Sequence, residues 1–123
     1  MSWASEYVGI PYEPSGRTRA GIDCWGLARL VWSEKFGRQL PDFEYAGDTA
    51  RAVRDYAPRV ETIAVTRPQE GDLALIRQRG RVRHVGIYAG SGQVLHVLDG
   101  GVVIERADSA RLRSTITEWR RPA

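Results

Sequence analysis

The sequence predicts a single α+β domain, residues 1–123, in which N-terminal helices pack on a curled antiparallel β-sheet of five to six strands. The chain length suits one domain, and a hydrophobic content of 42% is enough for a packed core. Apolar residues recur at helical spacing in the first half of the chain. Short alternating segments separated by turn residues fill the second half, which is typical of antiparallel strands.

The clearest predicted helix begins after Asp23. Four residues follow the spacing of one helix face: Cys24, Leu27, Ala28 and Val31. The Asp23 carboxylate can accept hydrogen bonds from the free amides of the first turn, so it is a good N-cap. Gly37, just after Phe36, is a good signal for the end of the helix.

Two further helices are expected. Ser2 is a suitable N-cap for a short helix that runs to about Val8. A second segment, residues 48–57, has Asp48 as its cap and ends before Pro58. The glycines and prolines between the short helix and Asp23 predict a long irregular loop.

The second half of the chain predicts an antiparallel meander. Turn signals such as Arg-Pro, Arg-Gly, Gly-Ser-Gly and Asp-Gly-Gly separate its apolar segments. The expected strands cover residues 60–66, 73–77, 82–89, 94–98, 102–105 and 114–119.

Cys24 is the only cysteine, so the chain has no internal disulfide. One interpretation is a buried packing residue, since free cysteine is often buried. The other is a nucleophile, because the amides of a helix start favour a thiolate. The neighbouring Asp23 charge opposes that thiolate, so the second interpretation requires a cationic partner.

His84 and His96, the only histidines, flank a predicted hairpin turn. A two-residue loop, Ser91–Gly92, would place them on opposite faces of the sheet. A three-residue loop, residues 90–92, would place them on the same face, diagonally offset. A three-residue loop commonly ends in a left-handed residue, a position that suits glycine. We therefore predict the three-residue loop and a shared face, where a base and an orienting group could serve a cysteine nucleophile.

Charge and hydropathy limit the partners. The net charge is +3, and arginines cluster at Arg77, Arg79, Arg81 and Arg83. No stacking-aromatic motif accompanies them, so nucleic acid is not an expected partner. No apolar run approaches the roughly 18 residues of a membrane span, so membrane insertion is not expected. The N-terminus lacks the features of a signal peptide, which predicts synthesis in the cytoplasm without a leader.

Three segments occur in a fixed order: GIPYEPSGRTRAGIDCWGL, GDLALI and HVGIYAGSGQVLHV. Together they resemble the NlpC-type cell-wall peptidases, a papain-like group, from about Tyr7 to the last strand. Trp25 departs from the small residue that is usual after the cysteine in bacterial members. The stretch DCWGL is similar to the branch encoded by tailed phages and prophages, where the domain belongs to the tail tip.

The resemblance implies a cysteine endopeptidase that cuts peptidoglycan stem peptides, typically between D-glutamate and a diamino acid. Cys24 corresponds to the nucleophile, His84 to the general base and His96 to the residue that orients the base. Tyr12 corresponds to a tyrosine that assists the oxyanion. No cofactor or metal is implied. A thiolate–imidazolium pair between Cys24 and His84 would offset the Asp23 charge.

Three more residues are candidates for contact with the substrate. Asp23 is expected chiefly as the helix cap, but it adjoins the nucleophile. Trp25 is either part of the core or a wall of the cleft. Gly86 leaves space beside His84 for a substrate or for the helix that carries Cys24.

The resemblance also implies a location and partners. In a phage tail tip, carried on the virion, the domain would contact bacterial peptidoglycan and other tail-tip proteins and open the wall during genome entry. A second interpretation is a structural tail-tip or assembly protein whose site is closed or inactive. A third is a zinc module built from Cys24, His84 and His96, although the chain lacks the usual local ligand pairs.

Overall fold

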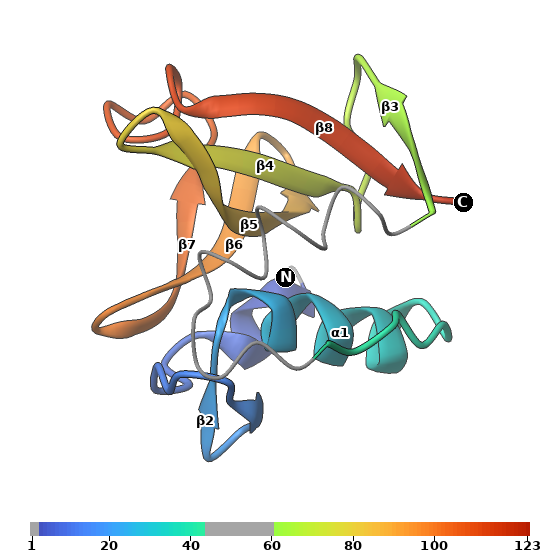
Figure 1. Ribbon diagram of the computed structural model, residues 1–123, viewed down its shortest axis with the longest axis vertical. Helices are drawn as coiled ribbons and strands as arrows, with labels where there is room; N and C mark the ends of the chain where they lie inside the picture. The colour runs from blue at the N-terminus through green and yellow to red at the C-terminus, as the bar shows by residue number, and fades with distance from the viewer. Residues whose placement is uncertain (1–2, 44–60) are drawn as a thin grey trace.

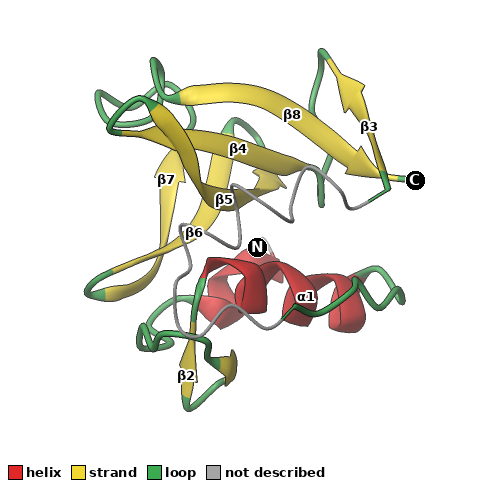
Figure 2. Cartoon of the chain, viewed as in Figure 1, coloured by secondary structure: helices red, strands yellow, loops and turns green. Residues whose placement is uncertain are grey.

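The computed structural model describes residues 3–43 and 61–123 (Figure 1). Its largest element is a six-stranded antiparallel sheet. Helix α1, Cys24–Lys35, packs against one face of this sheet (Figure 2). The helix expected at 48–57, its cap Asp48 and the cap Ser2 lie outside the described residues.

The N-terminal segment differs from its prediction in two details. The first helix is a 3-10 helix, η1, Trp3–Tyr7, rather than an α-helix. The predicted irregular loop contains a two-stranded ribbon of β1, Arg17–Thr18, and β2, Gly21–Ile22. Strands of two residues are too short to show a period in the sequence, which is why the ribbon was missed.

All six strands expected in the second half are present, with ends that shift by up to three residues. They are β3, Thr62–Val65; β4, Leu73–Gln78; β5, Arg81–Gly90; β6, Gln93–Leu98; β7, Gly101–Arg106; and β8, Ile116–Pro122.

The order of the strands corrects the predicted meander. Only β4 to β7 follow one another across the sheet, since the full order is β3-β8-β4-β5-β6-β7. Strand β8 returns to the far side of β4, where Glu118 pairs with Leu75. It also pairs with β3, where Trp119 lies opposite Val65. In Figure 1 the red β8 accordingly runs between β4 and β3.

The ends of α1 match the prediction. The Asp23 side chain accepts a hydrogen bond from the Gly26 amide at 2.7 Å, which makes Asp23 the N-cap. After the last turn, Gly37 adopts φ +65°, a left-handed conformation that suits glycine. The Arg38 amide then donates to the Trp32 carbonyl at 3.1 Å.

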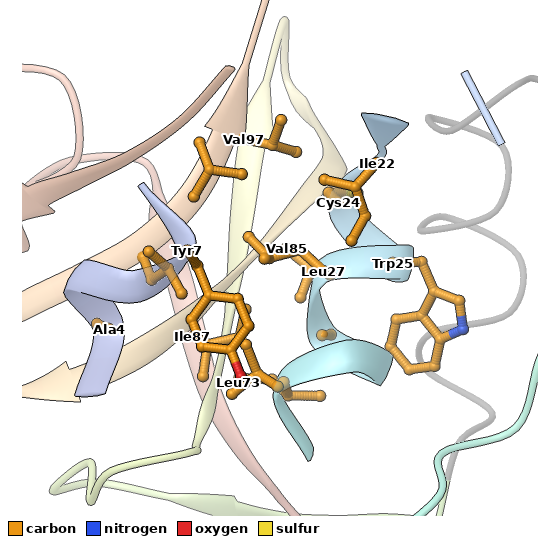
Figure 3. Packing of buried hydrophobic residues seen from close by; sticks show 14 of the residues in the cluster. Ala4, Tyr7, Ile22, Cys24, Trp25, Leu27, Leu73, Val85, Ile87 and Val97 are labelled. Atoms are coloured by element: carbon orange, nitrogen blue, oxygen red, sulfur yellow. The ribbon is translucent and has the colours of Figure 1, made fainter. Parts of the chain in front are cut away.

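Strand alternation divides the apolar residues between two faces of the sheet. The face toward α1 forms the main core with the helix and η1; it includes Leu75 of β4, Val85 and Ile87 of β5, and Leu95 of β6. Figure 3 shows Val85, Ile87 and the α1 residue Leu27 in this core. The opposite face carries a smaller cluster: Ala74, Ile76, Val94 and Leu112.

The β5–β6 turn differs from its prediction, but the register beyond it does not. Gly90 pairs with Gln93 around a two-residue turn, so the predicted three-residue loop is wrong. A bulge at residue 89 then restores the expected register, with Tyr88 opposite Val94 and Ile87 opposite Leu95. The extra residue in the strand therefore has the same effect on the side-chain faces as an extra residue in the loop.

Gly26 lies where helix α1 meets the loop that precedes it. Glycine normally weakens a helix relative to alanine by about 1 kcal/mol. A Cβ at this position, however, would lie 2.2 Å from the Gly16 carbonyl oxygen. We predict that Gly26→Ala lowers the free energy of unfolding by about 1–3 kcal/mol, as measured by urea denaturation.

Gly100→Ala is the matched control, because a Cβ there would meet nothing within 4 Å. Its free energy of unfolding should equal that of the wild type. A Gly26→Ala protein as stable as the wild type would contradict the close approach of the loop to the helix.

Candidate active site

Cys24 is the first residue of α1 and is only 1% exposed. Figure 3 shows it in the apolar core, near Ile22. Burial raises the pKa of the thiol to about 12, and the adjacent Asp23 charge raises it further, against hydrogen bonds from the Val85 and Trp25 amides. The thiol is therefore protonated at neutral pH in this arrangement.

The two histidines meet on strands β5 and β6. His84 Nε2 and His96 Nδ1 are 2.9 Å apart, a hydrogen-bond distance, which confirms the predicted shared face. Both rings are buried, with exposed fractions of 7% for His84 and 0% for His96. Burial lowers the pKa of His84 to about 3, with a smaller contribution from His96, so the imidazole is neutral at neutral pH.

A carboxylate extends this pair into a longer chain of hydrogen bonds. His96 Nε2 lies 2.9 Å from Glu105 Oε1, on strand β7. The Ser109 hydroxyl donates to the other oxygen of Glu105 at 2.7 Å, and Arg111 Nε lies 3.5 Å from that oxygen. Glu105 is not among the site residues that the sequence motifs predict. The available signal for Glu105 was its position on the strand next to His96: it lies two residues after Val103, the residue that pairs with His96.

Cys24 contacts Val85 of β5, and the preceding residue of that strand, His84, lies on the opposite face of the sheet. Cys24 belongs to the core cluster under the helix, together with Val85. His84, one residue earlier in the strand, belongs to the opposite face by alternation. Within residues 3–43 and 61–123, the only hydrogen bond of the His84 side chain is to His96. The thiolate–imidazolium pair expected from the sequence is therefore not formed here.

A small cavity lies on the histidine side of the sheet. Its volume is about 100 Å³, and its walls include His84, His96, Arg111 and Leu112. Cys24 does not line this cavity. The cavity is thus separate from the thiol.

The backbone of Tyr12 lies near the segment that leads to Cys24. It forms a parallel bridge with Ile22, two residues before Cys24. Its side chain is 36% exposed. The bridge fixes the backbone of the predicted oxyanion residue beside the strand that leads into α1.

The three substrate-contact candidates are all engaged within the fold. Asp23 is fully buried and binds Arg17 Nη1 at 2.9 Å in addition to capping the helix. Trp25 is 2% exposed and donates its indole N–H to the Pro41 carbonyl at 2.9 Å. A Cβ at Gly86 would lie 2.6 Å from Val94 Cγ1, so the Val94 side chain fills the space that was expected for a substrate or the helix.

Two further properties concern the described part of the chain. In residues 3–43 and 61–123, no three His, Cys, Asp or Glu side chains gather closely enough to hold a metal ion, and Cys24 does not join the two histidines as the zinc interpretation requires. No helix there has the length and apolar character to cross a membrane.

Two relatives of known sequence carry endopeptidase names. The chain is 30% identical over 122 residues to the murein DD-endopeptidase MepS/murein LD-carboxypeptidase of Escherichia coli K12, covering 98% of this chain and 60% of that protein. It is 32% identical over 118 residues to a probable endopeptidase NlpC homolog of Haemophilus influenzae, covering 95% and 58%. The chain thus spans less than two thirds of the length of either relative.

A solved structure has the same fold. The NlpC/p60 domain of the peptidoglycan hydrolase SagA superposes with a TM-score of 0.58 and 28% identity, over 85% of this chain and 83% of that one. The model of the NlpC/P60 family matches residues 9–121. That match takes in helix α1, both histidine strands and all but the last residue of β8. The chain belongs to the NlpC/P60 family.

Proposed function

We propose that this chain is a cysteine peptidase that hydrolyses stem peptides of bacterial peptidoglycan, at the bond between D-glutamate and a diamino acid. The observation that carries the proposal is the hydrogen bond between His84 and His96, one strand position from the Val85 contact of Cys24. Cys24, His84 and His96, the proposed nucleophile, base and orienting group, thus lie at adjoining positions. The endopeptidase names of both relatives support the same class of reaction, and the murein in the name of the Escherichia coli relative supports the same class of substrate.

The proposed chemistry has two stages. His84 takes the proton of the Cys24 thiol, and the sulfur attacks the amide carbonyl carbon. The resulting oxyanion is held by the Cys24 amide at the helix start and by the Tyr12 hydroxyl. His84 then gives the proton to the leaving amine as the C–N bond breaks. Water, activated by His84, hydrolyses the thioester and regenerates the thiol.

The resting arrangement sets a requirement for this reaction. Both partners are neutral and not bonded to each other within the described residues. The thiol must therefore come within hydrogen-bond reach of the imidazole when substrate binds. Catalytic hydrogen bonds are often long in free enzymes and tighten in the substrate complex; here the thiol must also move from the core face of β5 toward His84.

The second candidate is a structural tail-tip or assembly protein whose peptidase site is closed or inactive. The buried, protonated thiol favours it, since a thiol of this kind is a poor nucleophile. In either case we place the chain in a phage tail tip, carried on the virion, where neighbouring tail proteins bring it to peptidoglycan. Association of the protein with purified particles, tested by immunoblot, is the check on this location.

The first prediction concerns wall cleavage. Wild-type protein should release new stem fragments from purified peptidoglycan, and their masses in mass spectrometry should identify the cut bond. Cys24→Ala should release none, because the nucleophile is lost. Absence of fragments from both proteins would contradict the peptidase and support the structural candidate.

The second prediction concerns Tyr12. Removing one oxyanion donor typically costs about 10²–10³ in rate. Tyr12→Phe should therefore lower kcat by that factor and leave KM close to the wild-type value, as measured by fragment release over time. An unchanged kcat would exclude the hydroxyl from the oxyanion site.

The third prediction concerns the pH dependence of alkylation. Because the pKa of Cys24 is raised to about 12, thiolate is scarce at neutral pH and increases as pH rises toward that value. Labelling by iodoacetamide should therefore be slow at neutral pH and accelerate about tenfold per pH unit below the pKa. Mass spectrometry of timed samples gives the rates.

Asp23→Asn is the informative variant for this measurement. It keeps a side-chain acceptor for the helix cap but removes the charge that raises the pKa of Cys24. Its labelling curve should move to lower pH. Rapid wild-type labelling that is already constant below neutral pH would reveal a preformed thiolate and contradict the prediction.

A further inference from the structure

We propose that Glu105 is a positioning residue that fixes the ring tautomers of His96 and His84 and so leaves Nδ1 of His84 unprotonated, ready to accept a proton. The inference rests on the proposed function in one respect, the role of His84 as the base. The tautomers themselves follow from two contacts, His84 Nε2 with His96 Nδ1 and His96 Nε2 with Glu105 Oε1, and can be measured without any substrate.

The three groups form a continuous line through the sheet. His84 is on β5, His96 on the neighbouring β6, and Glu105 on β7 beyond it. Both links are 2.9 Å long: His84 Nε2 to His96 Nδ1, and His96 Nε2 to Glu105 Oε1. His84 thus forms its hydrogen bond through Nε2, and His96 forms hydrogen bonds through both of its ring nitrogens.

The carboxylate decides the state of His96. An ionised carboxylate only accepts hydrogen bonds, so His96 must carry its proton on Nε2 to bind Glu105. The opposite tautomer would turn a lone pair toward the carboxylate at 2.9 Å, and the two acceptors would repel each other. Burial lowers the pKa of His96, so the ring is neutral and holds one proton. Nδ1 of His96 is therefore an acceptor.

His96 in turn decides the state of His84. Since Nδ1 of His96 accepts, Nε2 of His84 must donate across the 2.9 Å contact. A neutral imidazole has one ring proton, and here it is on Nε2. Nδ1 of His84 consequently keeps its lone pair, which is the state that a general base requires.

The surroundings of Glu105 keep it ionised and in place. Burial by itself would raise the pKa of this carboxyl, but the hydrogen bonds from Ser109 and His96, with nearby Arg111, outweigh that effect and hold the pKa below its usual range. Ser109 is itself fixed, because its hydroxyl accepts the Leu112 amide at 3.1 Å. The segment after β7 therefore supports the carboxylate through two of its residues.

The wild-type protein is the first sample for the test. With only two histidines, nitrogen NMR of the full chain labelled with ¹⁵N-histidine resolves four ring nitrogens. Single substitutions His84→Gln and His96→Gln assign them. At neutral pH, both Nε2 atoms should give shifts of protonated nitrogen and both Nδ1 atoms shifts of unprotonated nitrogen. A protonated Nδ1 on His84 would overturn the inference, whatever the variants do.

Glu105→Leu tests the cause, because it removes the acceptor at similar size. The shifts of His84 should then move toward those of a mixture of tautomers, and kcat for stem-peptide cleavage should fall about ten- to a hundredfold. Glu118→Leu is the matched control: Glu118 lies on β8, is 44% exposed and pairs with Arg120, so the spectrum should stay as in the wild type. Unchanged histidine shifts in a folded Glu105→Leu protein would overturn the inference.

The two proposals fail in different ways. If the tautomers are as stated and the wild type cleaves no peptidoglycan, the peptidase proposal fails and the tautomer assignment stands. If the wild type cleaves but Nδ1 of His84 carries the proton, the peptidase stands and the role of Glu105 is refuted.

Discussion

The rest of the candidate site depends on the hydrogen bonds that the Asp23 carboxylate accepts from the Gly26 amide and from Arg17. This carboxylate is fully buried, caps α1 through the Gly26 amide and binds Arg17 Nη1 at 2.9 Å. Arg17 also donates to the Gly16 carbonyl and to Asp42, so this one arginine, through two ion pairs, joins the loop, the helix start and the segment after the helix. The same charge raises the pKa of Cys24. The group that caps the helix at Cys24 thus adds to the effect of burial in keeping the thiol protonated.

The sheet gives the two halves of the candidate site different environments. The thiol lies in the apolar core beneath the helix, whereas the imidazole pair lies among polar partners on the opposite face, beside Glu105 and a small cavity. Strand β5 joins the two halves, since Val85 touches the thiol and His84 begins the polar chain. A reaction of Cys24 assisted by His84 would require the thiol to move toward the imidazole, because hydrogen bonds hold His84, His96 and Glu105 in place.

Much of this arrangement could be predicted from the sequence, for identifiable reasons. Asp23 and Gly37 marked the ends of α1 because capping depends on local residue types. The shared face of His84 and His96 was predicted correctly although the turn was not, since a bulge and a longer loop shift the register equally. The place of β8 was missed because alternation reveals a strand but not its neighbours. Glu105 was missed because an acidic residue at a strand end is ordinarily solvated.

The position of strand β8 has a consequence for the order in which the sheet can form. Although β8 is the last strand, it occupies an interior position between β3 and β4, and residues 116–122 form both pairings. The edge of β4 that pairs with β8 therefore stays unpaired until residues 116–122 have been made. An exposed strand edge is a template for wrong pairing. The strand that comes last in sequence among the six strands of the sheet is thus the one that closes the gap between β3 and β4.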